Sequence, residues 1–363
     1  MKLNLASLFL ATSAISVVAQ DQTIVDLAVA TEDLSTLVSA VQAADLAETL
    51  SDPAGTFTVF APVNSAFEGV DPKYLTEPWK AHLTDILLFH VLGSEVFSAD
   101  VTDGLLITPL NGDNFTATVN DTGVFLGSDL FSSQVTTADV DASNGVVHLI
   151  SALLVPSWMA TTLADIAANV EGFGSVATFI TQAGLESEIA AENRTIFAPN
   201  AEAFAAISPD LTAQIVNDES LIGVVLKHHI VEGVWSKAAL TDGLELTTLD
   251  GNPLIVSVSG DSIMVDESAV VEYDFLATNG VSHIISTILL PPSLASGNET
   301  ETTTAPGAMP VETPVAEPTT DEEGSAAPGA TPVTAPVAEP TSSSGVLALG
   351  SAFSVISAAF ALY

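Results

Sequence analysis

The sequence contains no cysteine, and it has 6 lysine and arginine residues against 45 aspartate and glutamate residues. Without cysteine the chain has no disulfides, thiol nucleophiles or thiolate metal ligands, so a secreted domain built from it must be held by packing alone. The formal net charge of −39 predicts a surface that repels nucleic acid and anionic lipid. The G-x-S-x-G, H-E-x-x-H and Walker motifs are also missing. The sequence therefore predicts a protein that is not an enzyme and needs no cofactor. An extracellular hydrolase remains as an alternative, because any chain this acidic offers pairs of carboxylates.

The two ends of the chain are apolar. Residues 1–19 have a lysine, an apolar run and small residues at Val17 and Ala19, a pattern typical of a secretory signal peptide. Residues 346–363 are apolar and are followed by no basic residue, which favours a glycolipid (GPI) anchor signal over the alternative, a single membrane span. These features predict a protein of the secreted pathway, displayed at the cell surface or extracellular.

A Pro/Thr/Ala-rich segment at residues 294–345 precedes the tail. It repeats PGAMPVETPVAEPTT as PGATPVTAPVAEPTS. Such a composition cannot bury a core and predicts an extended, disordered, O-glycosylated stalk. Four Asn-x-Thr sequons are candidate glycosylation sites, namely Asn114, Asn120, Asn193 and Asn298.

The part of the chain before the stalk contains an internal sequence repeat. TVFAPVNSAF at Thr58 matches TIFAPNAEAF at Thr195, TDGLLITPLNG matches TDGLELTTLDG, and NGVVHLISALLVP at Asn144 matches NGVSHIISTILLPP at Asn279. The three matches have nearly the same offset, which indicates a duplicated domain. We expect one domain at residues 20–157 and a second at residues 158–293.

Within each copy, helical and strand patterns follow one another in a fixed order. Apolar residues at helical spacing come first, for example Leu34, Leu37, Val38 and Val41. Short apolar runs joined by Asn-Gly and Asp-Gly turn signals come later. Helices first and paired strands later predict an α+β domain.

The repeated blocks resemble the fasciclin domain, in which a TVFAPxxxAF block, a central Tyr-His pair and a closing NGVVHxIxxVLxP block recur in this order. The resemblance implies tandem modules with a β-sandwich-like strand core and packed helices. It also implies extracellular adhesion or matrix contact, through weak multivalent binding to matrix or cell-wall glycans or to surface proteins of other cells. The alternative is a glycan or small-molecule site in the cleft between the repeats, lined by Trp158.

The resemblance also implies candidate partner-binding residues, since adhesion in some animal members is attributed to an Asp-Ile pair before the closing block and to the Tyr-His pair. By position these become Asp139 with Val140, and Asp274 with Phe275. The central pair becomes Phe89-His90 in the first copy and His228-His229 in the second, so its tyrosine is missing from both.

Histidines recur at matching positions, and a metal site is one interpretation of them. A zinc site needs three or four convergent ligands, whereas these histidines stand inside apolar runs. We therefore predict that His90, His148 and His283 are structural, each bonded to a backbone carbonyl. The acidic run from Asp139 lacks the glycine and glutamate of a calcium loop, so no metal site is expected.

Overall fold

The computed structural model describes residues 22–169 and 174–295. The expected signal peptide, the apolar tail, the sequon at Asn298 and almost all of the stalk lie outside the described residues. No helix within the described ranges has the length and apolar character needed to cross a membrane.

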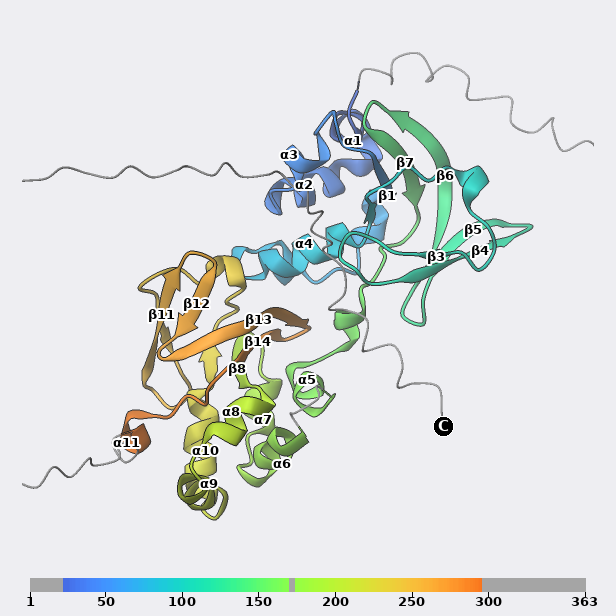
Figure 1. The fold of residues 1–363 in the computed structure, drawn as a ribbon. Helices are drawn as coiled ribbons and strands as arrows, with labels where there is room; N and C mark the ends of the chain where they lie inside the picture. Colours follow the sequence, from blue (N-terminus) through green and yellow to red (C-terminus); the bar gives the residue numbers. More distant parts are fainter. Residues whose placement is uncertain (1–21, 170–173, 296–363) are drawn as a thin grey trace, which may run out of the picture. The chain divides into compact units, whose positions relative to one another are not determined.

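Within the described residues, the first repeat forms four α-helices, several short 3-10 helices and one sheet (Figure 1). The helices are α1 (Ile24–Ala30), α2 (Ser35–Ala43), α3 (Ala47–Leu50) and α4 (Lys80–Leu88). The strands are β1 (Phe57–Pro62), β2 (Val91–Leu92), β3 (Leu106–Ile107), β4 (Phe115–Asn120), β5 (Gly123–Gly127), β6 (Ser132–Ala142) and β7 (Gly145–Ile150). They form a seven-stranded sheet in the order β2-β1-β7-β6-β5-β4-β3, in which β1 and β7 are parallel.

The second repeat has the same strand order, β9-β8-β14-β13-β12-β11-β10. Its strands are β8 (Arg194–Pro199), β9 (Ile230–Glu232), β10 (Glu245–Thr247), β11 (Pro253–Ser259), β12 (Ser262–Val265), β13 (Ser268–Ala277) and β14 (Gly280–Ile285). Its helices are α5 (Leu163–Asn169), α6 (Gly174–Gln182), α7 (Glu186–Ala190), α8 (Ala201–Ala206), α9 (Pro209–Val216), α10 (Glu219–His228) and α11 (Pro292–Ala295). The expected α+β class with two tandem modules is confirmed.

Each repeat has two apolar cores, one on either side of its central strands. In β1 the side chains alternate between them, because successive residues of a strand point to opposite faces. Val59 and Ala61 pack against helices α1, α2 and α4, whereas Phe60 packs with Phe115 of β4 and Leu126 of β5. Bulges in β6 and β13 interrupt the pairing with β7 and β14, and such bulges bend a sheet. The strands thus enclose a sandwich-like core while the helices cover the other face.

The Asn-Gly of each closing block has a structural role beyond a turn. The Asn144 side chain is buried, its Oδ1 accepts the Ile24 N–H at 2.9 Å, and its Nδ2 donates to the carbonyl oxygens of Leu50 and Asp52 at 2.8 and 3.0 Å. Asn279 makes the matching bonds to Leu163, Ile189 and Ala191. One amide thus satisfies three backbone groups and ties the helices to the sheet.

The repeats differ most between the first strand and the helix that leads to the histidine pair. In the first repeat this segment forms three short 3-10 helices, Asn64–Phe67, Pro72–Leu75 and Glu77–Trp79. In the second repeat it forms the α-helices α8 and α9. The equivalent stretch of chain therefore folds differently in the two repeats.

Candidate functional site

Asp139 and Asp274, the predicted partner-binding acids, occupy equivalent bulges in β6 and β13. Both have left-handed backbones, with φ of 58° and 59°. The Asp139 carboxylate accepts hydrogen bonds from the Ser98 backbone N–H at 2.7 Å and from the Ser98 hydroxyl. Asp274 accepts the Lys237 N–H at 2.8 Å. Each carboxylate therefore holds the start of a 3-10 turn against the bulge.

The histidines of the closing blocks bind the same two aspartates. The His148 Nδ1 accepts the Asp139 N–H at 3.1 Å, and its Nε2 lies 2.8 Å from the Val96 carbonyl oxygen. His283 repeats this with Asp274 at 3.2 Å and Trp235 at 2.7 Å. Burial lowers the pKa of His283. Residues that the sequence suggested separately thus form one Asp-His unit in each repeat.

The Asp-His unit presents its carboxylate, and little else, to solvent. The side chain of Asp139 is 38% exposed, whereas that of His148 is 3% exposed. Val140 and Phe275 are partly buried and pack against the helix cores. Asp139 is exposed and Asp274 is partly exposed, so these acids are the part of the predicted pairs that a partner can reach.

His228 and His229 lie in the interior, and this burial argues against direct contact of either ring with a partner. The His229 Nδ1 lies 2.7 Å from the Val225 carbonyl oxygen, and its Nε2 accepts the Leu289 N–H at 3.0 Å. The His228 Nδ1 lies 3.1 Å from Asp250 Oδ1.

His90 makes the same two kinds of contact as His229, with the Ile86 carbonyl oxygen at 2.7 Å and the Leu154 N–H at 2.9 Å. Burial lowers the pKa of His90 and of His229 to about 4. Both rings are therefore neutral at pH 7. In the described part of the chain, no group of three or more His, Asp or Glu side chains is arranged to hold a metal ion.

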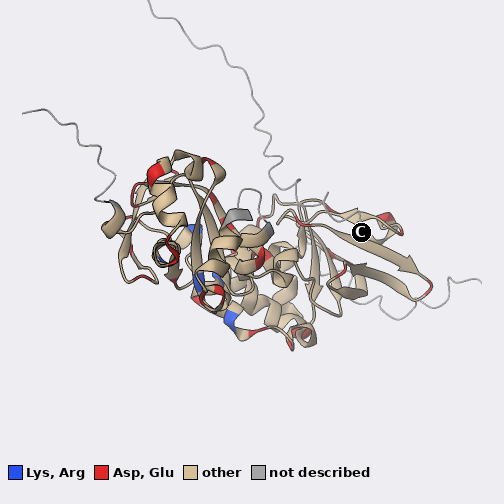
Figure 2. Ribbon diagram, turned by 90° about the horizontal axis from the view of Figure 1, so that it is seen from below, with Lys and Arg blue, Asp and Glu red and all other residues tan. Residues whose placement is uncertain are grey.

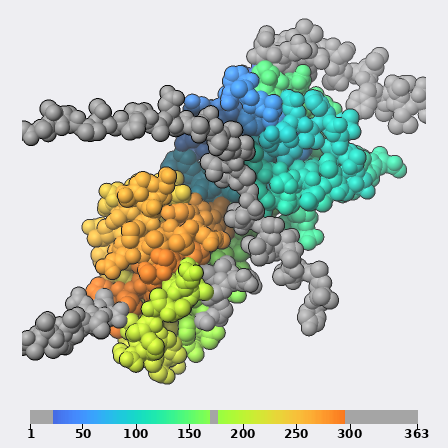
Figure 3. Space-filling model, in the orientation of Figure 1, coloured from blue at the N-terminus to red at the C-terminus, as the bar shows by residue number. Residues whose placement is uncertain are grey.

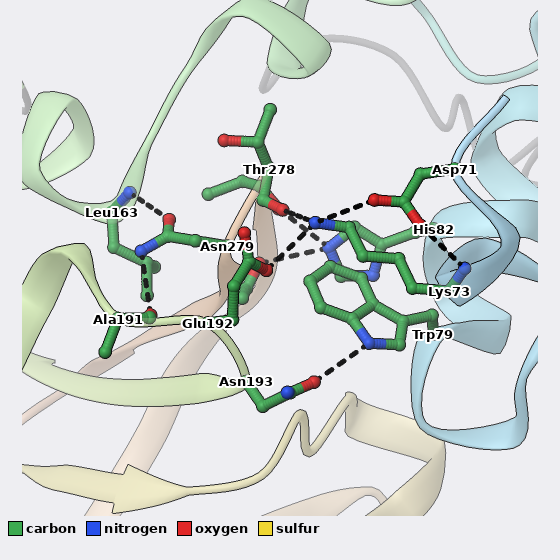
Figure 4. A network of polar contacts seen from close by, with 12 residues as sticks. Asp71, Lys73, Trp79, His82, Leu163, Ala191, Glu192, Asn193, Thr278 and Asn279 are labelled. Atoms are coloured by element: carbon green, nitrogen blue, oxygen red, sulfur yellow. Dashed lines mark hydrogen bonds and ion pairs between the residues drawn. The ribbon is translucent and has the colours of Figure 1, made fainter. Parts of the chain in front are cut away.

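A polar network joins the two repeats, and the sequence analysis did not predict it (Figure 4). The Lys73 ammonium donates to Glu192 Oε2 at 2.9 Å and to the Thr278 carbonyl oxygen at 2.7 Å. It also lies 4.6 Å from the centre of the Trp79 ring. The Trp79 Nε1–H in turn donates to Asn193 Oδ1 at 3.1 Å. The segment that differs between the repeats thus serves, in the first copy, as the contact with the second.

His82 forms the buried centre of this junction. Its Nε2 lies 3.1 and 3.0 Å from the carbonyl oxygens of Ala277 and Gly280, so Nε2 carries the proton. Its Nδ1 has no hydrogen-bond partner among the described residues. Burial lowers the pKa of His82 to about 4, and the Lys73 charge acts in the same direction.

Trp158 belongs to the same junction. Its ring packs edge-on against His82 and Tyr74, with centroid distances of 5.0 and 5.7 Å. Its Nε1–H donates to Asp85 Oδ2 at 2.7 Å, and the residue is 9% exposed. The alternative of a glycan or small-molecule site between the repeats placed Trp158 in its lining, and here the Trp158 ring packs against His82 and Tyr74. The one sequence signal for the junction is that Trp79 and Trp158 have no matching tryptophan in the other repeat.

Replacing Lys73 by methionine is expected to loosen the junction. The variant keeps the apolar stem but loses two charge-assisted hydrogen bonds and the contact with the Trp79 ring, at a cost of about 1–2 kcal/mol. Small-angle scattering of the ectodomain should then show a larger radius of gyration, and the fluorescence of Trp79 should shift to the red. Lys80→Met is the control, because Lys80 pairs with Asp45 of its own repeat. Equal scattering from both variants would show that Lys73 does not hold the repeats together.

Acidic residues outnumber basic ones along the described chain, as the red and blue segments of Figure 2 show. Four basic side chains of the described ranges are engaged in contacts: Lys73 pairs with Glu192, Lys80 with Asp45 and Arg194 with Glu232, while Lys237 lies over the ring of Tyr273. Sequon residues Asn114 and Asn120 are exposed. Asn193 is exposed as well, although its Oδ1 receives the Trp79 hydrogen bond.

Comparison with known proteins gives consistent matches. The fasciclin domain model matches twice, over residues 32–156 and 171–291. Transforming growth factor-beta-induced protein ig-h3 of Sus scrofa is 28% identical over 244 residues, covering 66% of this chain and 35% of that protein. Human periostin is 27% identical over 250 residues, covering 66% and 29%. Protein sll1483 of Synechocystis is 40% identical over 138 residues, covering 37% and 73%.

The chain therefore spans about a third of the length of its first curated relatives. Among solved structures, a FAS1 domain pair from the insect cell adhesion molecule fasciclin I is 16% identical, with a TM-score of 0.37, and the match covers 72% of this chain and 98% of that one.

Proposed function

The chain belongs to the fasciclin domain family, and we propose that it is an extracellular adhesion or matrix-contact protein. The observation that carries this proposal is the tandem pair of fasciclin domains. The proposed function involves no catalytic step. The partners we propose are matrix or cell-wall glycans, or surface proteins of other cells. The excess of exposed carboxylates favours partners that are neutral or positively charged.

The proposed mode of action is weak contact at several points. Two repeats joined through the Lys73–Glu192 and Trp79–Asn193 contacts present their surfaces as a pair. When one surface binds, the second meets its partner at a raised effective concentration, and many copies on one cell raise the avidity further. The expected signal peptide, stalk and GPI anchor would supply that display.

The experiment that tests this proposal uses intact cells that display the full chain. The cells are treated with a phosphatidylinositol-specific phospholipase, and release of the protein is measured together with adhesion to glass, to wall polysaccharide and to sister cells. We expect release together with loss of adhesion. Release of the protein with adhesion unchanged would contradict the adhesion role. Adhesion that persists without release of the protein would contradict the GPI anchor but not the adhesion role.

The carboxylates of Asp139 and Asp274 are the proposed contact points. Replacing both by asparagine is expected to lower adhesion at least threefold, with little change in the urea midpoint. Asparagine tolerates the left-handed backbone and still accepts the capping N–H, so the variant removes the charge and keeps the bulge.

The control for this pair is the double variant Asp103→Asn with Asp242→Asn. These exposed acids also occupy matching positions and accept backbone N–H groups, from Val119 at 3.0 Å and from Val258 at 2.9 Å. Equal losses of adhesion in the two double variants would indicate a general effect of charge and would argue against a contact at Asp139 and Asp274.

A further inference from the structure

The second repeat encloses an apolar pocket of about 270 Å³. Helices α5, α6, α8, α9 and α10 supply its walls, and strands β8 and β14 supply its floor. Phe197, Ile222 and Ile230 lie deep in it and are buried. At the rim, Phe204 and Ile215 are partly exposed and Val216 is 44% exposed. Figure 3 shows the yellow-green part of the chain, which includes α8, at the surface. The pocket therefore has a route to solvent.

The first repeat has a pocket at the equivalent position, but it is nearly filled. The space between α1, α2, α4 and β1 measures about 30 Å³, roughly the share of one water molecule in the liquid. Both pockets are lined by equivalent residues, for example Leu50 and Ile189, or His90 and His229. The large pocket is thus a feature of one copy of the domain and not of the fold.

Two kinds of sequence difference contribute to the larger pocket. Strand β14 has Ser282 where β7 has Val147, which is a smaller side chain facing the helices, although the paired residue is larger, Ile196 in place of Val59. Helix α2 has Leu37 as its third residue, whereas α6 has Val176. In addition, the segment that forms the junction in the first repeat forms α8 and α9 here, and these helices extend the wall.

The chemistry of the lining defines the ligand. No charged side chain lines the pocket among the described residues, and both ring nitrogens of His229 are already bonded. A charged ligand group would lose its hydration without compensation. Ser282 supplies a hydroxyl group to the lining. Such a hydroxyl can bond one hydroxyl or carbonyl group of a ligand.

We propose that the second repeat binds a small, uncharged, largely apolar molecule in this pocket, with its single polar group at Ser282. Engineered apolar cavities of about 150 Å³ bind benzene, which has six non-hydrogen atoms. At the same volume per atom, this pocket holds roughly eleven non-hydrogen atoms. A medium-chain alcohol has this size and chemistry. The proposed binding site is distinct from the proposed contact points for adhesion, because its lining includes neither Asp139 nor Asp274.

The test is a titration of the soluble two-repeat ectodomain with decan-1-ol, followed by methyl NMR. We expect the methyl signals of Ile180, Ile222 and Val225 to shift in a saturable way, while those of Val59 and Leu37 stay in place. Decanoate at pH 7 is expected to bind at least tenfold more weakly. The absence of saturable shifts in the second repeat, or equal binding of decanoate, would overturn the proposal.

A variant that carries residues of the first repeat at the equivalent positions tests whether the ligand binds in this pocket. Ser282→Val with Val176→Leu is expected to weaken decan-1-ol binding at least tenfold, and the spectrum of the free protein shows whether it is folded. If the double variant does not fold, Ser282→Val alone must weaken binding at least threefold. Ser257→Val is the control, because Ser257 is an exposed residue of β11 outside the pocket. Unchanged binding in the folded pocket variant would overturn the assignment.

Discussion

Lowering the pH from 7 to 5 is expected to reduce the free energy of unfolding by about 6 kcal/mol. Three buried histidines carry this effect: His82, His90 and His229, each with a pKa that burial lowers to about 4. In the unfolded chain a histidine has a pKa near 6.5. Each ring at pH 5 is thus about 1.5 pH units below its unfolded pKa yet still neutral in the fold, which costs roughly 2 kcal/mol.

The sign of this change in the free energy of unfolding depends on whether the folded or the unfolded state binds more protons. Between pH 6.5 and 4 the unfolded chain takes up protons at these rings and the folded chain does not, so protonation favours unfolding. The stability is complete above pH 6.5 and is lost as the pH falls toward 4. Burial lowers the pKa of His283 too, which adds to the effect. Burial raises the pKa of Asp85, which acts in the opposite direction.

Urea unfolding at pH 7 and at pH 5 measures this loss. A total of about 6 kcal/mol is comparable to the whole stability of a typical domain, so the midpoint should fall steeply. The variants His90→Gln and His229→Gln are less stable at pH 7, but each should remove about a third of the pH dependence. If the two variants keep the full pH dependence of the wild type, the buried histidines are not its source.

The sequence predicted the features that both repeats share. The α+β class, the duplication and the buried setting of His148 and His283 follow from local patterns that occur twice. Local patterns are informative here because turn residues, strand alternation and helical spacing act over a few positions. The hydrogen bond from the Asp139 N–H to His148, nine positions away, could not be predicted without knowledge of the bulge in β6.

The features found in one repeat could not be predicted in this way. Lys73 bonds to Glu192 and Thr278, which are 119 and 205 positions away, and no periodicity signals such a contact. The pocket of the second repeat depends on the joint effect of Ser282, Val176 and the helices α8 and α9. Ser282 and Val176 are each ordinary substitutions when considered alone. The expectation that His228 and His229 face a partner came from the family resemblance, and the structure places both rings inside.

The glycine of the first closing block is expected to tolerate no side chain, and Gly145→Ala should cost at least about 4 kcal/mol. Gly145 has a φ of 149°, and a Cβ at this position would lie 2.0 Å from the Phe57 carbonyl oxygen. That oxygen belongs to β1, which pairs in parallel with β7 and is buried on both faces. Neither strand can shift without opening both cores of the repeat, so the overlap cannot be relieved cheaply.

Gly104→Ala separates this overlap from the backbone cost of the substitution. Gly104 also has a positive φ, 77°, but a Cβ at this position would have no neighbouring atom within 4 Å. An alanine there pays the left-handed backbone cost alone, about 1–2 kcal/mol. We therefore expect urea unfolding to show an intact first repeat for Gly104→Ala and loss of its cooperative transition for Gly145→Ala. Similar midpoints for the two variants would mean that β1 and β7 can separate without loss of the fold. The close approach of the two strands would then not explain why the closing block has a glycine after its asparagine.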